Sequence, residues 1–227
     1  MRRTLLLLSA LAMMLAGVAA PVAATTNHLT PLPDGHGFWL AGDDAGDEVA
    51  GSSGRATVNA NGATVSVTAT NLTPGHTYTM WIVYFNDSTQ CQFGESDPAT
   101  NCGPGDLVAG RGGVNYADGK VAGGTGEATF SGRLNAGDGP DRGPMPPGQP
   151  GVVPYEPSDS PDFHVVLRSH GPKIPGEVSE QILTFEGGCD VEVGPPPGQS
   201  GPEFSIPEEP GECGDIQLYI FETTPAS

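Results

Sequence analysis

Three histidines and one arginine are the residues of this chain whose types and positions could do chemistry. They are His76, His164, Arg168 and His170. The last three stand at even spacings in and just after the strand-like run Phe163–Ser169, and side chains at such positions of a strand share one face. Imidazole nitrogens bind transition metals, and an arginine beside an imidazole can hold a carboxylate or a phosphate.

The spacing of these residues favours a structural role over a metal site. His164 and His170 are six residues apart, which is about 20 Å along an extended strand, whereas metal ligands lie about 2 Å from the ion. A bend in the strand, or a third ligand such as His76 from another strand, would make a metal site possible. Arg168 lies about 7 Å from His170, and we expect it to pair with one of the many carboxylates. We therefore predict no metal and no catalytic residue, and we keep the four as candidate ligand-binding residues.

Alternation of apolar and polar residues at period two predicts an all-β protein. Asn61-Gly62 is a strong hairpin signal between two alternating runs. Thr77–Phe85 is typical of a central strand, and Trp81 is its expected core anchor. The other strands are expected at 56–60, 63–69, 113–116, 120–122, 127–134, 163–169, 181–185 and 215–222, with a turn at 117–119. We predict an antiparallel Ig-like β-sandwich of about eight to ten strands with long Pro/Gly-rich loops and no convincing helix.

The distribution of proline and glycine predicts the domain organisation. Together they make up 57 of the 227 residues, concentrated between the strand-like runs. We expect one β-sandwich domain at 55–227, with loop insertions at 135–162 and 194–212, of which the first is predicted to be exposed or mobile. An acidic flexible lead-in at 25–54 and a signal peptide at 1–24 precede the domain.

The N-terminus predicts export. Arg2 and Arg3 form a positive region, Thr4–Ala20 is an apolar run, and small residues follow, as in a secretory signal peptide. Cleavage fits after Ala20 or after Ala24, and the second is preferred because the first leaves a proline just beyond the cut. A retained N-terminal anchor is the structural alternative. We expect a secreted or otherwise extracytoplasmic protein with no integral membrane segment after cleavage.

Net charge limits the partners. Without Arg2 and Arg3 the mature chain has seven basic and 27 acidic residues, a net charge of −20. Such a field repels nucleic acid and anionic membranes and attracts cations. The acidic cluster of the lead-in lacks the ordered spacing of a calcium loop and is interpreted as solvated. It consists of Asp43, Asp44, Asp47 and Glu48.

The four cysteines of an exported chain predict two disulfides. Three connectivities are possible, and sequential pairing, Cys91 with Cys102 and Cys189 with Cys213, is the simplest because each pair then closes an irregular Gly/Pro-rich segment. A cysteine metal site is disfavoured, since neither spacing resembles C-x2-C.

Two segments of the chain resemble segments of other proteins. At NLTPGHTYTMWIVYFN (Asn71–Asn86) and FHVVLRSHGPKIPGEVSEQILTFEGGC (Phe163–Cys189), the chain resembles a group of exported bacterial β-sandwich proteins that share PGHxYT and RSHGPxIPG motifs. The resemblance covers most of Arg55–Tyr219. It implies an exported sandwich, and it carries over no activity, ligand or functional residue. The segment Gly171–Gly176 is predicted to be a rigid corner that connects one core strand to the next.

Two hypotheses about function follow from the sequence. The first is a non-enzymatic binding or structural module at the cell surface or outside the cell, with a carbohydrate, a protein or cations as partner and no cofactor. The second is a metalloenzyme or hydrolase with a site around His76, His164, Arg168 and His170. Convergence of these four side chains in one cavity would favour the enzyme.

Overall fold

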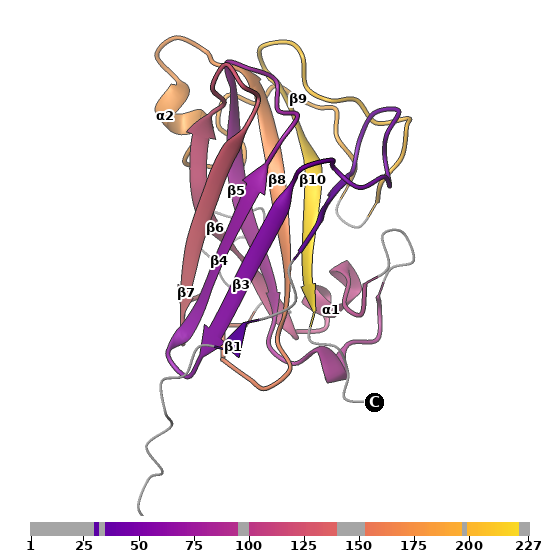
Figure 1. Cartoon of the computed structure of the whole chain (residues 1–227), viewed down its shortest axis with the longest axis vertical. Helices are drawn as coiled ribbons and strands as arrows, with labels where there is room; N and C mark the ends of the chain where they lie inside the picture. The colour runs from indigo at the N-terminus through magenta and orange to yellow at the C-terminus, as the bar shows by residue number, and fades with distance from the viewer. Residues whose placement is uncertain (1–29, 32–34, 95–99, 140–152, 197–198, 223–227) are drawn as a thin grey trace, which may run out of the picture.

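Two β-sheets packed face to face form the body of the molecule (Figure 1). The computed structural model describes residues 30–31, 35–94, 100–139, 153–196 and 199–222. The strands are β1 (Thr30–Pro31), β2 (Gly37–Trp39), β3 (Ser53–Asn59), β4 (Gly62–Ala69), β5 (His76–Phe85), β6 (Gly112–Val121), β7 (Ala128–Asn135), β8 (Asp162–Pro172), β9 (Val191–Glu192) and β10 (Glu212–Glu222). The helices are the 3-10 turn Ser88–Gln90, α1 (Pro104–Val108) and α2 (Val178–Gln181). The predicted all-β sandwich is confirmed.

The first sheet has the order β1-β3-β4-β7, and the second has the order β2-β10-β8-β5-β6, with β9 added beside β10. All pairings between these strands are antiparallel except that of β9 with β10. The hairpin predicted at Asn61-Gly62 joins β3 to β4. β5 is a central strand, as predicted, because it lies between β8 and β6.

The second sheet is covered on both faces. Its inner face carries Tyr78, Ile82 and Val165, which belong to the main core between the sheets. Its outer face carries a separate apolar cluster in which Trp81 and Phe85 are 1% exposed. Trp81 therefore anchors the outer cluster rather than the core between the sheets. The described parts of the segments that contain α1, and of those that contain α2 and β9, lie toward the two opposite ends of this sheet (Figure 1).

One predicted turn is wrong. Residues 112–121 form the single strand β6, and the pairing with β5 shifts so that Met80 faces Asp118 while Trp81 faces Tyr116. Ala117 is the extra residue of a β-bulge. The sequence Ala117-Asp118-Gly119 resembles that of a turn. A bulge and a turn favour the same small and acidic residues. Here the pairing with β5 keeps the segment within one strand.

The strand predicted at 181–185 is also wrong. Gln181 is the last residue of α2, and residues 182–185 follow it as turns and bends. Gln181 is 0% exposed, and its side chain accepts from Ile174 N at 2.8 Å and donates to the carbonyls of His170 and Pro172 at 3.1 and 3.2 Å. The buried amide satisfies the backbone of the corner after β8, so the chain turns there instead of entering a new strand.

The predicted lead-in takes part in the sandwich. β2 pairs with β10, Trp39 belongs to the main core, and Val49 is 0% exposed. The insertion at 135–162 likewise reaches the core, because Tyr155 is 0% exposed. Residues 140–152 and the predicted signal peptide at 1–24 lie outside the described residues.

Both predicted disulfides are present, Cys91–Cys102 and Cys189–Cys213, with sequence separations of 11 and 24 residues. In the described ranges, no helix is long and apolar enough to cross a membrane.

Candidate functional site

The structure places three of the four candidate residues on β8 and separates them into two groups. His164, Arg168 and His170 share the outer face of the second sheet, opposite Val83, Thr79 and the start of β5. β8 runs unbroken from Asp162 to Pro172, so about 20 Å separates the two histidines, as the sequence predicts. His164 lies at one end of the sheet, and Arg168 and His170 lie near the other.

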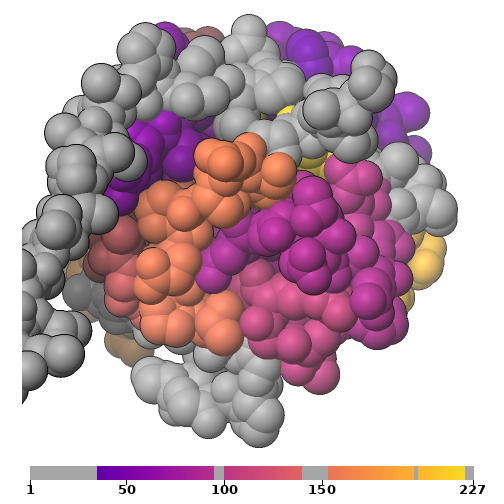
Figure 2. Space-filling view, turned by 90° about the horizontal axis from the view of Figure 1, so that it is seen from below, coloured from indigo at the N-terminus to yellow at the C-terminus, as the bar shows by residue number. Residues whose placement is uncertain are grey.

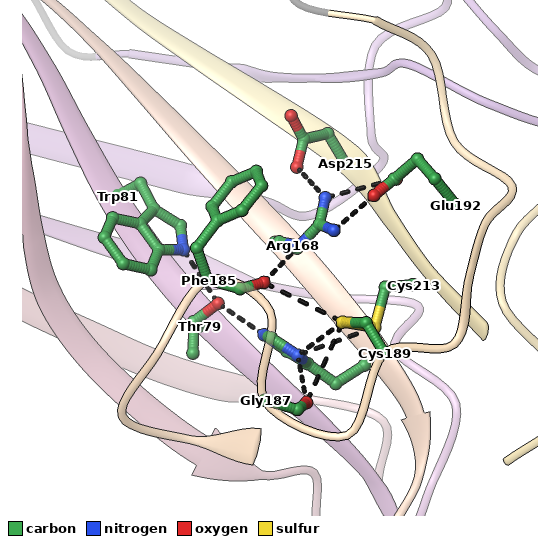
Figure 3. A network of polar contacts seen from close by, with 10 residues as sticks. Thr79, Trp81, Arg168, Phe185, Gly187, Cys189, Glu192, Cys213 and Asp215 are labelled. Carbon is green, nitrogen blue, oxygen red and sulfur yellow. Dashed lines mark hydrogen bonds and ion pairs between the residues drawn. A yellow bond between two sulfur atoms is a disulfide. The ribbon is translucent and has the colours of Figure 1, made fainter. Parts of the chain in front are cut away.

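Arg168 is buried and is held by an ion cluster of one buried carboxylate, Asp215, and one exposed carboxylate, Glu192 (Figure 3). Its guanidinium donates to Phe185 O at 2.9 Å, to Asp215 Oδ1 at 3.1 Å and to both carboxylate oxygens of Glu192. The group also lies 3.9 Å above the Phe185 ring centroid. Arg168 is 2% exposed. The predicted pairing with a carboxylate is confirmed, and two carboxylates take part.

His170 is the centre of a buried chain of hydrogen bonds. Its Nδ1 lies 2.9 Å from Gly187 O, and its Nε2 lies 2.8 Å from Thr79 Oγ1. A carbonyl can only accept, so Nδ1 carries the proton and Nε2 accepts from the hydroxyl. Thr79 in turn accepts from Trp81 Nε1 at 2.8 Å (Figure 3). The imidazole is 0% exposed, and both of its nitrogens are used.

The Cys189–Cys213 disulfide lies against the same imidazole. The two sulfurs are 3.5 and 3.7 Å from His170 Nδ1. His170, Cys189 and Cys213 have metal-ligand spacing, but cysteines joined in a disulfide have no thiolate to offer a metal. The arrangement instead fastens the segment 185–192 to β8 and β10 through one covalent bond and two polar networks.

Tight backbone contacts hold the corner that follows His170. Gly171 has φ of 64°, and a Cβ there would come within 2.7 Å of Glu209 O. Only glycine fits a left-handed position with a backbone so close. The corner predicted from Gly171–Gly176 is therefore real, but it leads into α2.

Burial moves the pKa values of two groups in this network. Desolvation, reinforced by the nearby Arg168 charge, lowers the pKa of His170 to about 4. Desolvation raises the pKa of Asp215 to about 6, although Arg168 acts in the opposite direction. At neutral pH the imidazole is uncharged and the carboxylate is ionised, which suits a donor–acceptor chain beside an ion pair.

The pKa of His170 predicts how its substitution depends on pH. The unfolded imidazole takes up a proton near pH 6.5 and the folded one only near pH 4, so acid favours unfolding and stability is lost as the pH falls through this window. His170→Gln should therefore destabilise the protein at pH 7.5, with a difference from wild type that shrinks by up to about 3 kcal/mol by pH 4.5. Urea unfolding of both proteins measures it. A constant difference across these pH values would contradict the prediction.

His76 stands apart from the other candidates. It opens β5 next to an irregularity in the pairing with β8 and is 8% exposed. Burial lowers its pKa, and the charge of Glu208 opposes this. Among the described residues, no hydrogen bond or ion pair joins His76 to Arg168 or His170. The four candidates thus do not converge on one cavity.

His164 belongs to a second polar group, which sequence reasoning missed. Asp162 Oδ1 lies 3.4 Å from His164 Nε2, and Glu222 is the cross-strand neighbour of Asp162 on β10. One ligand atom from each of the three residues lies within 4.8 Å of the others. The spacing of Asp162 and His164 signals a shared face of one strand, whereas the contribution of Glu222 depends on the register of β10.

Residues 91–94 and 100–108, next to the Cys91–Cys102 disulfide, contact this end of the sheet and are organised by a buried carboxylate. Asp106, 0% exposed, accepts from the backbone N–H groups of Gln92, Phe93 and Gly103 and pairs with Arg111. Burial acts to raise the pKa of Asp106, but these hydrogen bonds hold it below the ordinary value. Figure 2 shows the corresponding face, where the magenta and pink surface lies beside the orange surface of the segment leading into β8.

Comparison of the chain with protein-family models, with curated proteins and with solved structures finds no match.

Proposed function

We propose that this chain acts outside the cytoplasm as a non-enzymatic binding or structural module. The observation that carries the proposal is that Arg168 and His170, the polar pair with the best spacing for ligand capture, take their partners from within the protein. A catalytic base or an anion clamp needs groups that a substrate can reach. These two are buried, and their hydrogen bonds fasten a loop to the sheet.

Export is supported by the N-terminal sequence and by the two disulfides, which form and persist in oxidising compartments. The motifs in 71–86 and 163–189 support a relationship with exported bacterial sandwiches that share them. The charge of the mature chain favours cations, carbohydrates or proteins over nucleic acid as partners. The enzyme hypothesis would require His76 and His164 to approach Arg168 and His170, and the separation along β8 argues against it.

The test combines export with the accessibility of His170. We expect the full chain, expressed in a bacterium, to be recovered outside the cytoplasm with a mature N-terminus at Thr25 and both disulfides formed. Brief treatment with diethylpyrocarbonate, read by mass spectrometry, should modify His36, whose side chain is 60% exposed, and leave His170 unmodified.

His36 serves as the internal control, because it reports that the reagent is active in the same sample. Cytoplasmic retention of an unprocessed chain would contradict export. Modification of His170 as fast as His36 would show a reachable imidazole and would favour the enzyme hypothesis.

A further inference from the structure

The outer face of the second sheet carries, at the end opposite His170, three side chains with the chemistry of metal ligands. Asp162 and His164 are alternate residues of β8, and Glu222 ends β10 directly across from Asp162. Asp162 is 0% exposed and His164 is 8% exposed, whereas Glu222 is partly exposed. The group is therefore inside the protein with one side toward solvent.

The carboxylate of Asp162 is the observation that points to a ligand. Both of its oxygens are buried, and neither accepts a hydrogen bond from any residue that the structure describes. A buried carboxylate normally has several hydrogen-bond donors, because leaving one unsatisfied is costly. Asp106, equally buried and held by three backbone N–H groups and Arg111, shows how this chain satisfies such a group elsewhere.

Glu222 is already oriented toward the same point. Its two oxygens accept from the backbone N and side-chain Nδ2 of Asn101, at 2.6 and 2.7 Å. A carboxylate oxygen with one hydrogen bond keeps a lone pair for a metal. Partners of this kind commonly fix the orientation of ligands around bound metals. Asn101 is itself held in place by the adjacent Cys91–Cys102 disulfide.

The distances suit a small divalent ion. Bonds of about 2.0–2.1 Å in a tetrahedral zinc site place neighbouring ligand atoms about 3.3 Å apart. His164 Nε2 and Asp162 Oδ1 are 3.4 Å apart, and the third ligand atom lies within 4.8 Å of both. Imidazole with carboxylates is a donor set that zinc accepts.

We propose that Asp162, His164 and Glu222 form a site for one divalent metal ion of the zinc class, with Asn101 as a positioning residue. The ion joins the ends of β8 and β10 and lies next to Asn101, beside the Cys91–Cys102 disulfide. A metal-free ion pair between Asp162 and a protonated His164 is the competing arrangement. It leaves Asp162 Oδ2, which is buried, without a donor, so the metal site accounts for more of the geometry.

This inference does not rest on the proposed function. A metal at this end of the sheet is compatible with a binding or structural module, and its test does not use export or the reactivity of His170.

The experiment is zinc titration of the full mature chain, purified without a tag and stripped with EDTA. We expect calorimetry to show one zinc ion bound per chain. At a hundredfold excess over the dissociation constant, zinc should raise Tm by about 5–10 °C. Asp162→Asn and Glu222→Gln should abolish the binding, and Asn101→Ala should weaken it by about tenfold.

The matched control is Glu48→Gln, which alters the exposed pair of Glu48 with His36 and should leave zinc binding unchanged. Asn101 is an exposed residue, so its variant tests the site even if Asp162→Asn fails to fold. Absence of zinc binding by the wild type, or binding that Glu222→Gln and Asn101→Ala leave intact, would overturn the proposal.

Discussion

Arg168→Met is expected to lower the free energy of unfolding by about 3–5 kcal/mol. The substitution keeps much of the apolar stem but leaves Asp215 buried without its cation, and it removes the donor to Phe185 O. Truncating one member of a buried ion pair costs more than the pair contributes, because the remaining charge is still desolvated. Urea unfolding at pH 7.5, followed by tryptophan fluorescence, measures the difference.

Arg133→Met is the matched control. Arg133 is exposed, and its side chain donates to the nearby Asn135 Oδ1 at 2.9 Å, so its loss should change stability by less than about 0.5 kcal/mol. Adding Asp215→Asn to Arg168→Met should recover part of the loss, since it removes the stranded charge. A cost for Arg168→Met no larger than that of the control would show that the ion cluster does not hold the fold.

The strand pattern could be predicted from the sequence because burial on one face imposes alternation within each strand. The shared face of His164, Arg168 and His170 follows from the same period. The pairing of cysteines was also predictable, since each short loop favours its own closure. These features depend on residues close together in the chain.

The features that the sequence did not reveal depend on segments that meet only in the fold. A carboxylate partner for Arg168 was expected, but Glu192 and Asp215 could not be chosen among 27 acidic residues. The role of Glu222 depends on the register between β8 and β10. Gln181 appeared to begin a strand because its tertiary role, satisfying the carbonyls of the corner, leaves no local periodic signal.

Removal of the Cys189–Cys213 disulfide is the second large effect that we expect. For a sequence separation of 24 residues, the loss of loop-closure entropy predicts a cost of about 3.5 kcal/mol for Cys189→Ala with Cys213→Ala. The matched pair Cys91→Ala with Cys102→Ala, with a separation of 11, should cost about 2.8 kcal/mol. Denaturant unfolding of the two double variants measures both.

The structure adds that the first of these costs should be coupled to Arg168. Phe185, Gly187 and Glu192 reach Arg168 and His170 from the segment on either side of Cys189 (Figure 3). Once the disulfide is gone, this segment can leave β8, and part of the ion cluster is lost with it. Arg168→Met should then cost at least about 1 kcal/mol less in the Cys189/Cys213 variant than in the wild type, because residues in one network are not additive.

The Cys91–Cys102 disulfide provides the control for the coupling between Arg168 and the Cys189–Cys213 disulfide. Arg168→Met should cost the same in the Cys91/Cys102 variant as in the wild type, because the described residues next to that disulfide contact the opposite end of the sheet and share no contact with Arg168. Equal costs of Arg168→Met in all three backgrounds would mean that the ion cluster holds the segment without help from the disulfide. A smaller cost in the Cys189/Cys213 background alone would show that the covalent and polar fastenings act as one unit, which is the role the structure supports for Arg168 and His170.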